Sequence, residues 1–397
     1  MDASLATSAH ACLPDYAGGS IVNLVASLMD ALGATDRSVP PLSNRTVPAL
    51  LKGRRRIVLL VVDGMGQAQL TGAAWRGALH EHACGTLTSV FPSTTATAIT
   101  TLMTGEPPSR HGLTGWHMHF PEIDAVGAVL PFQTRGAEQP MTELGLDPAR
   151  VFDHPALCDR LPVASFALGP ERILTSEYNR AHTGRARRIG YGSPEHLFQA
   201  LLNCLRIHSE PCFVYAYFAD FDSTAHRHGV TSTQAQRVLQ RFDDAFGAFL
   251  AAAAGLDATV VVTADHGFID SPPERLIQLE NHPVLQATLR LPLCGERRAA
   301  YCYVRPERRA EFEAYATDRL ADAVWVFSSQ KLIEQGWFGP GPPHPRLNER
   351  VGDYALVARD DWTVKDWVPG EQRHPLIGVH GGVSEDEMIV PLLIAQP

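Results

Sequence analysis

Four short, unbroken runs of apolar residues constrain this chain most strongly. They are rich in β-branched side chains and span residues 57–62, 213–218, 259–263 and 388–394. A run of this kind, without alternation of polar and apolar residues, is typical of a strand buried on both faces, as in a parallel sheet. Segments with helical spacing of apolar residues lie at 20–33, 194–208, 232–254 and 307–321. We therefore expect an α/β fold with a central, mostly parallel sheet flanked by helices.

Chemically active residues occur where these runs end. Asp63, Asp222 and Asp265 each follow a run directly or within a few residues. Because open α/β sheets bind ligands beyond the carboxyl ends of their strands, we expect these side chains to share one site. Seven candidates in all lie in five separate segments: Asp63, Thr95, Asp222, His226, Asp265, His266 and His380.

This set of side chains suits a pair of metal ions. Three aspartates and three histidines supply the ligands for two neighbouring ions, and the hydroxyl supplies a nucleophile between them. Two-metal sites displace groups at phosphorus, because the ions stabilise both the attacking and the leaving oxygens. The residues therefore predict metal-dependent phosphoryl or phosphodiester hydrolysis.

Some single segments also have a plainer interpretation. Asp63 precedes Gly64 and Gly66 and could be a turn residue that caps the next helix. Asp222 and His226 are four residues apart, which points two ligands the same way from one helical turn. Asp265 and His266 are adjacent, so their joint use requires a bend.

The hydroxyl candidate lies at the start of a predicted helix that runs from about residue 93 to Gly105. A Thr95 hydroxyl there would meet backbone N–H donors and the positive end of the helix dipole, which hold an anionic phosphoryl group. Simple capping of the helix by Ser93 or Thr94 is the alternative. His380 lies beside two glycines, so an ordinary loop residue is the alternative there.

Composition excludes several classes of partner. The net charge is −9, which leaves no basic excess to bind a nucleic-acid backbone. No run approaches the roughly 18 apolar residues of a membrane helix. The first 13 residues lack Lys and Arg, so we expect no secretory signal. Seven scattered cysteines suggest no disulfide framework, and we expect a cytoplasmic protein.

Two regions interrupt the regular pattern. Residues 111–190 are rich in Pro, Gly, His and Arg, and residues 270–375 contain many prolines and short strand-like runs. We interpret residues 1–397 as one domain in which both regions are insertions that cap the site or select the substrate. The oligomeric state stays open.

The order of these segments resembles the alkaline phosphatase superfamily, and within it the type I phosphodiesterase/nucleotide pyrophosphatase branch. The resemblance extends from about Arg56 to Ile394 and rests on the combined order Asp, Thr, Asp-x-x-x-His, Asp-His, His. It implies an alkaline-phosphatase-like three-layer sandwich with capping insertions. In that family the nucleophile lies ten residues before the glycine of a Thr-Gly pair, a spacing that Thr95 and Gly105 keep.

The resemblance also implies a role for each residue. One zinc would be held by Asp222, His226 and His380, and the other by Asp63, Asp265 and His266. Thr95 would attack phosphorus and form a covalent phospho-threonine intermediate, which water then hydrolyses. The absence of thiolate ligands suits zinc on chemical grounds as well, with manganese as the alternative.

One departure from the family pattern concerns substrate binding. Eukaryotic-type members carry an asparagine that donates to a phosphate oxygen after a His-Gly turn, and Trp116 occupies that place here. We therefore treat Trp116 as a candidate substrate-binding residue. The expected partner is a small phosphate ester, with a nucleotide as one option.

Several activities remain open. The sequence contains no Cys/Ser-x-Pro-x-Arg motif, which argues against a sulfatase. A threonine nucleophile without an obvious phosphate-binding arginine favours diester or pyrophosphate cleavage. A phosphomonoesterase or a phosphonate hydrolase on the same scaffold is the alternative, and a non-catalytic metal-binding pseudoenzyme is a more distant one.

Overall fold

A computed structural model describes residues 11–44, 46–71, 76–208 and 210–397. Most of the N-terminal segment that we expect not to be a secretory signal therefore lies outside the described residues. Among the helices described, none is both long and apolar enough to cross a bilayer.

The core of the molecule is a seven-stranded sheet with the order β2-β18-β9-β1-β8-β6-β7. Four of its strands are the apolar runs predicted from the sequence: β1 (Arg56–Val62), β8 (Cys212–Phe218), β9 (Ala258–Thr263) and β18 (Ile389–Ala395). The other three are β2 (Ala83–Thr88), β6 (Ala164–Pro170) and β7 (Arg187–Tyr191). Strands β9, β1, β8, β6 and β7 run parallel to one another, and β18 is antiparallel to β9 and β2.

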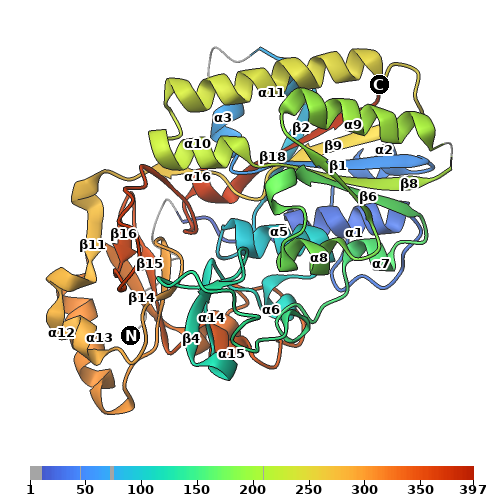
Figure 1. The fold of residues 1–397 in the computed structure, drawn as a ribbon. Helices are drawn as coiled ribbons and strands as arrows, with labels where there is room; N and C mark the ends of the chain where they lie inside the picture. Colours follow the sequence, from blue (N-terminus) through green and yellow to red (C-terminus); the bar gives the residue numbers. More distant parts are fainter. Residues whose placement is uncertain (1–10, 45, 72–75, 209) are drawn as a thin grey trace.

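Helices cover both faces of this sheet (Figure 1). One face carries α9 (Pro194–Ile207), α10 (Asp220–His228) and α11 (Thr233–Ala252). The other carries α1 (Ile21–Ala31), α5 (Thr95–Thr104), α7 (Leu157–Arg160) and α8 (Glu177–Thr183). The predicted fold class, a mostly parallel sheet between two layers of helices, is confirmed.

A second, antiparallel sheet stands beside the first and has the order β14-β15-β13-β12-β3-β4-β5. Its strands come from two distant parts of the chain: β3 (His117–Phe120), β4 (Ala125–Ala128), β5 (Gln133–Thr134), β12 (Cys294–Gly295), β13 (Ala299–Cys302), β14 (Val324–Ser328) and β15 (Tyr354–Ala358). Helices α12 (Pro283–Thr288) and α13 (Arg309–Arg319) accompany it (Figure 1).

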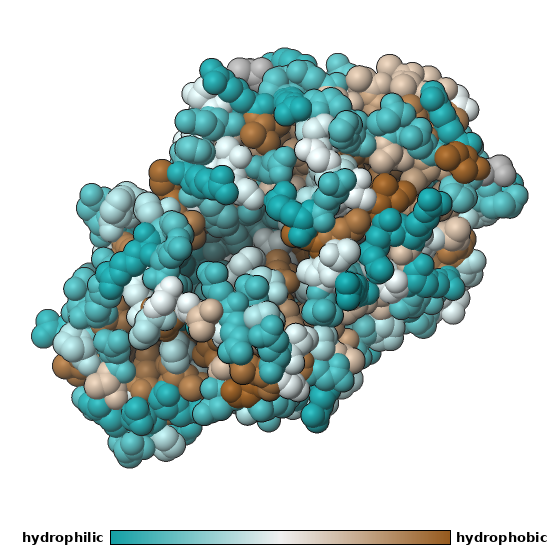
Figure 2. All heavy atoms as spheres, viewed as in Figure 1, coloured by the Kyte–Doolittle hydropathy of each residue, from teal (hydrophilic) through white to brown (hydrophobic). Residues whose placement is uncertain are grey.

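The two regions that we interpret as insertions, 111–190 and 270–375, supply all of this second sheet. The first region does more than cap the site, because it also contains β6 and β7 of the central sheet. Figure 2 shows a recess between the part built on the central sheet and the part built on the second sheet.

Candidate active site

The register of the central sheet brings two aspartates together. Val61 of β1 lies opposite Tyr217 of β8 on one side and Thr263 of β9 on the other. The three strands therefore end at nearly the same level, and Asp63 and Asp265 emerge side by side. Both carboxylates are buried, with 2% and 0% of their surface exposed.

Each of these two carboxylates uses one oxygen to bond the protein and leaves the other free. Tyr217 donates its hydroxyl hydrogen to Oδ2 of Asp63. Oδ1 of Asp265 accepts the backbone N–H groups of Gly64 and His266, both at 3.0 Å. Oδ1 of Asp63 and Oδ2 of Asp265 are buried and have no hydrogen-bond partner among the described residues.

Close packing explains the glycines of these segments. Gly64 has a φ of +75°, and a Cβ there would lie 2.4 Å from the ring of Phe268. A Cβ on Gly267 would lie 1.9 Å from the carbonyl oxygen of Asp386. Gly267 thus lets the chain after His266 approach a neighbouring backbone, where the sequence had indicated only a need for a bend.

The Asp222–His226 pair projects from the first turns of α10, which follows β8. The four-residue spacing places Oδ1 of Asp222 3.3 Å from Nε2 of His226. Oδ1 of Asp222 is also buried, and no residue in the described part of the chain forms a hydrogen bond with it.

His380 comes from the far end of the chain and follows strand β17 (Gly378–Val379), which pairs with β10 (Ile269–Asp270). Its Nε2 lies 3.2 Å from Nε2 of His226 and 3.8 Å from Oδ1 of Asp222. Its ring also stacks on that of His266, with centroids 3.7 Å apart. The predicted candidate at this position therefore lies with the others.

Backbone carbonyls set the tautomer of all three imidazoles. Nδ1 of His226 lies 2.9 Å from the Gly378 carbonyl, Nδ1 of His266 lies 2.9 Å from the Gly267 carbonyl, and Nδ1 of His380 lies 3.1 Å from the Ser93 carbonyl. A carbonyl can only accept, so each Nδ1 carries the hydrogen and each neutral ring keeps a lone pair on Nε2. A hydrogen bond from Nδ1 to a backbone carbonyl, with Nε2 turned toward the site, is typical of metal-binding histidines.

Without a cation this arrangement is electrostatically unfavourable. Nε2 of His266 lies 3.5 Å from Oδ1 of Asp63 and 3.4 Å from Oδ2 of Asp265, so lone pairs face one another. Burial, reinforced by the charges of Asp222 and Asp265, raises the pKa of Asp63 well above its usual value. Burial also raises the pKa of Asp265. A divalent cation between these atoms would remove the repulsion.

The pKa shifts of two further histidines show what each position favours, which is a neutral ring at His380 and a positive charge beside Asp222 at His226. Burial, followed by the nearby His266 and His226 rings, lowers the pKa of His380 well below its usual value. Burial works to lower the pKa of His226, but the Asp222 carboxylate outweighs it and the pKa is raised.

The side chains thus fit metal ions at two overlapping positions. One ligand atom from each of Asp63, Asp265 and His266 lies within 4.8 Å of the others, and the same holds for Asp222, His266 and His380. His226 adjoins the second set at 3.3 Å from Asp222. Carboxylate oxygens and imidazole nitrogens are ligands that zinc accepts.

Thr95 lies at the start of α5 and its Oγ1 is 3.1 Å from Nε2 of His266. The alternative of simple helix capping does not hold, because the side chain of Thr94, the N-cap residue, makes no capping hydrogen bond to the described residues of this helix. Ser93 donates to the Gly382 carbonyl at 2.8 Å, and Thr94 donates to Oε1 of Glu296 at 2.6 Å. The first turn of α5 therefore keeps N–H groups for an anion beside Thr95.

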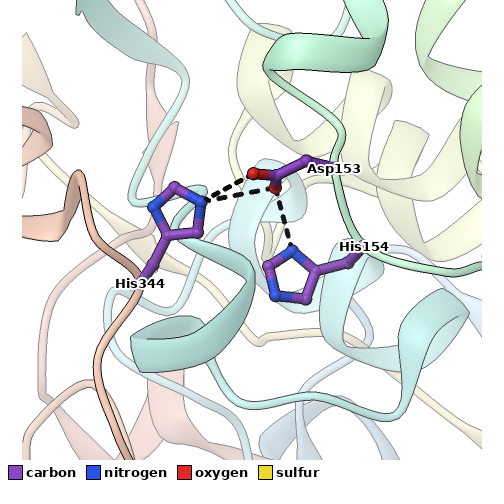
Figure 3. Close-up of side chains that lie close together, drawn as sticks. All are labelled: Asp153, His154 and His344. Carbon is purple, nitrogen blue, oxygen red and sulfur yellow. Dashed lines mark hydrogen bonds and ion pairs between the residues drawn. The ribbon is translucent and has the colours of Figure 1, made fainter.

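A second group of potential metal ligands, Asp153, His154 and His344, lies elsewhere in the molecule (Figure 3). Here Nδ1 of His344 accepts the backbone N–H of Arg346 at 3.1 Å, so Nε2 carries the hydrogen and donates to Asp153 at 3.0 Å. Nδ1 of His154 lies 3.1 Å from the same carboxylate. The hydrogen on Nε2 occupies the direction that a metal would need.

Two cavities extend from the candidate site in different directions. Both are lined by Thr95, Trp116 and Asp222. The first, of about 440 Å³, is mostly apolar and includes Ile99, Met103, Leu168, Ile173, Leu174 and Tyr215. The second, of about 320 Å³, contains most of the charged residues and is lined by strands of the second sheet and the segment around residue 365. Trp116 is 37% exposed and stands between them.

Sequence reasoning missed two residues at this site. Tyr217 orients Asp63, but an aromatic residue in a buried strand has the signature of core packing. Glu296 accepts from Thr94 and from the backbone N–H of Trp116 at 2.7 Å. It lies 202 residues from Thr94 along the chain, and no local pattern relates the two.

Comparison with known proteins agrees with the fold and with the motif order. The family model described as type I phosphodiesterase / nucleotide pyrophosphatase matches residues 57–155 and 169–382. A search of curated proteins finds no match.

Solved structures of similar fold include murine ectonucleotide pyrophosphatase/phosphodiesterase 5, with a TM-score of 0.62 and 18% identity over 86% of this chain and 88% of that one. The human protein gives 0.63 and 17%, over 86% and 88%. Phosphonoacetate hydrolase from Sinorhizobium meliloti 1021, in complex with phosphonoacetate, gives 0.59 and 17%, over 86% and 90%. Likeness at these identities establishes a common fold.

Proposed function

The chain belongs to the type I phosphodiesterase / nucleotide pyrophosphatase family, as its motifs indicated, and on this premise we propose that it hydrolyses phosphodiesters or nucleotide pyrophosphates at a two-metal site. One observation carries the proposal. Carboxylate oxygens without partners and imidazole Nε2 lone pairs converge beside the hydroxyl of Thr95. Such a group of atoms needs cations, and the hydroxyl next to it needs activation.

Two sets of side chains would hold the ions: Asp222, His226 and His380, and Asp63, Asp265 and His266. Bound zinc would act as a Lewis acid that lowers the pKa of a hydroxyl and neutralises charge on phosphate oxygens. Manganese is the alternative ion for these ligands.

Thr95 would be the nucleophile. Its Oγ would form a bond to phosphorus while the bond to the leaving oxygen breaks, which gives a phospho-threonine intermediate that water then hydrolyses. The N–H groups at the start of α5 would bind the non-bridging oxygens of the phosphoryl group. Trp116, at the junction of both cavities, would contact the substrate.

The apolar cavity supports a substrate with a sizeable uncharged group next to the phosphate. Its volume of about 440 Å³ lies within the usual range of small-molecule sites. A nucleoside is one candidate for this group. An inactive variant of the murine relative has been solved in complex with AMP.

Substrate preference and a matched pair of variants test the proposal. Zinc-loaded protein is assayed with bis-p-nitrophenyl phosphate, thymidine 5′-p-nitrophenyl phosphate and p-nitrophenyl phosphate. We expect diester turnover that the Thr95→Ala variant abolishes. Thr97→Ala, a change at another buried threonine of the same helix, should retain it.

Protein quenched during turnover should carry a phosphoryl adduct on Thr95 by mass spectrometry. Dominant monoester turnover would identify a phosphomonoesterase instead. Equal turnover in the Thr95→Ala variant and the parent protein would refute the nucleophile assignment. No turnover of any ester would point to a phosphonate hydrolase or to a binding protein.

A further inference from the structure

The smaller of the two cavities carries most of the charge. Its lining includes the cations Arg135, Arg297 and Lys365 and the carboxylates Glu296, Asp366 and Glu371. It opens from Thr95 in a different direction from the apolar cavity, so one substrate could occupy both.

Two of the three cations already have carboxylate partners. Arg135 donates to Asp366 at 2.7 Å and to Glu371 at 2.9 Å, and both contacts are partly buried. It also donates to the carbonyls of Leu293 and Asp366. Lys365 pairs with the other oxygen of Glu371. Arg135 and Lys365 therefore stabilise the wall of the cavity.

Arg297 is different. Among the described residues no carboxylate lies within 4.0 Å of its guanidinium, and its one hydrogen bond is a long contact of 3.4 Å to the His374 carbonyl. The guanidinium lies over the indole of Trp367, 5.5 Å from the ring centroid. Since a guanidinium has five N–H donors, most of its donors are available.

Arg373 also lies over the indole of Trp367 and serves as a comparison for Arg297. Its guanidinium lies 5.4 Å from the centroid of Trp367, but it donates to both oxygens of Glu280 at 2.8 and 2.9 Å. It does not line the cavity. Of these two arginines, the one that faces the cavity is the one without a carboxylate.

Burial lowers the pKa of Arg297, and the nearby charges of Glu371 and Glu296 oppose that shift, but among the described residues Glu296 forms no ion pair with the guanidinium. Its Oε1 accepts hydrogen bonds from the Thr94 hydroxyl and the Trp116 backbone, which hold the carboxylate toward the start of α5. Two further carboxylates of the lining, Asp366 and Glu371, are bonded to Arg135 and Lys365.

We infer that this cavity is an anion subsite, in which Arg297 binds a second negatively charged group of the substrate while the reacting phosphorus lies at Thr95. This inference rests on the proposed function, because Thr95 defines where the reacting group lies. A planar guanidinium matches a carboxylate or a phosphate through two parallel N–H donors. The substrate class is thus a phosphate ester or phosphonate with a second carboxylate or phosphate group.

Calorimetric binding to zinc-loaded protein tests the subsite without requiring turnover. The probes are alkylphosphonates with two to four carbons and the same molecules ending in a carboxylate. We expect the carboxylate to improve affinity about ten-fold or more at one chain length, as a charge-assisted bidentate bond would. A third series that ends in a phosphate monoester decides between the two anions.

Variants then assign the effect to Arg297. Arg297→Gln should abolish the gain from the carboxylate, Arg297→Lys should restore part of it, and Arg373→Gln should leave it intact. Equal binding of charged and uncharged probes by the parent protein would overturn the subsite. A gain that persists in Arg297→Gln would overturn the role of Arg297. Turnover of bis-p-nitrophenyl phosphate is measured separately, so loss of the proposed activity is distinguishable from loss of the subsite.

Discussion

The candidate metal site and the Asp153–His154–His344 cluster contain the same kinds of side chain but differ in the orientation of their rings. In the first, backbone carbonyls accept from Nδ1 and leave Nε2 free. In the second, the Arg346 backbone N–H donates to Nδ1 of His344, so Nε2 carries a hydrogen and donates to Asp153. The backbone partner of each imidazole therefore decides between a ligand and a hydrogen-bond donor.

The carboxylates differ in the same way. Within the described ranges, Oδ1 of Asp63, Oδ1 of Asp222 and Oδ2 of Asp265 are buried without a hydrogen-bond partner. Asp153 accepts from two histidines, and their hydrogen bonds outweigh burial and hold its pKa well below the usual value. Partner-free oxygens beside free nitrogens indicate a cation site, whereas a satisfied carboxylate indicates a structural contact.

The largest expected effect comes from substituting one aspartate in each cluster and comparing the metal content and turnover of the two variants. Asp265→Ala should lose at least one metal ion per chain and reduce kcat on the order of 1,000-fold, because the ion supplies several kcal/mol of transition-state stabilisation. Asp153→Ala should keep its metal content and its turnover. Elemental analysis and diester kinetics measure both. Near-normal turnover with full metal content in Asp265→Ala would refute the assignment.

Much of the fold could be predicted from the sequence, because buried parallel strands have a strong local signature. The runs that became β1, β8 and β9 are apolar on both faces. Strand β6 contains Gly169 and Pro170, and β7 is an edge strand that begins with Arg187 and Arg188, so neither shows that signature.

The candidate site, like the fold, could be predicted from the sequence only in part. The aspartates at the ends of strands were accessible to sequence reasoning, because the ends of parallel strands meet at one edge. The free guanidinium of Arg297 was not, because it depends on which carboxylates distant parts of the chain bring to Arg135 and Lys365. The different ring orientations of His344 and His380 likewise depend on backbone contacts that only the folded chain defines.

An effect of intermediate size is expected in the pH dependence of the unfolding free energy. Burial lowers the pKa of His182, which lies near the second cluster, to about 4. The buried, neutral His182 ring contributes fully to the unfolding free energy above the unfolded pKa of about 6.5. This contribution is lost as pH falls toward 4, because in that range only the unfolded chain binds the proton. We expect His182 to account for a loss of about 2 kcal/mol between pH 7 and pH 5.

Urea unfolding of the metal-loaded protein at both pH values measures this loss, and His182→Gln is the comparison. The variant should be less stable at pH 7 but lose about 2 kcal/mol less than the parent protein on acidification. Equal pH dependence of the two proteins would show that His182 titrates normally in the folded chain.

The smallest expected effect tests whether the tautomer of a histidine ring decides whether it binds metal. His344 is buried, and its contact with Asp153 ties residues near 344 to a segment almost 200 residues earlier in the chain. His344→Ala should cost about 1 kcal/mol of unfolding free energy, because one partner of the bond, Asp153, is partly exposed. Metal content and diester turnover should be unchanged. His380→Ala, by contrast, should lose a metal ion, because Nε2 of His380 carries a lone pair that can bind the ion. Loss of metal in His344→Ala, measured in the same elemental analysis, would show that the backbone partner of a ring does not separate the two kinds of cluster.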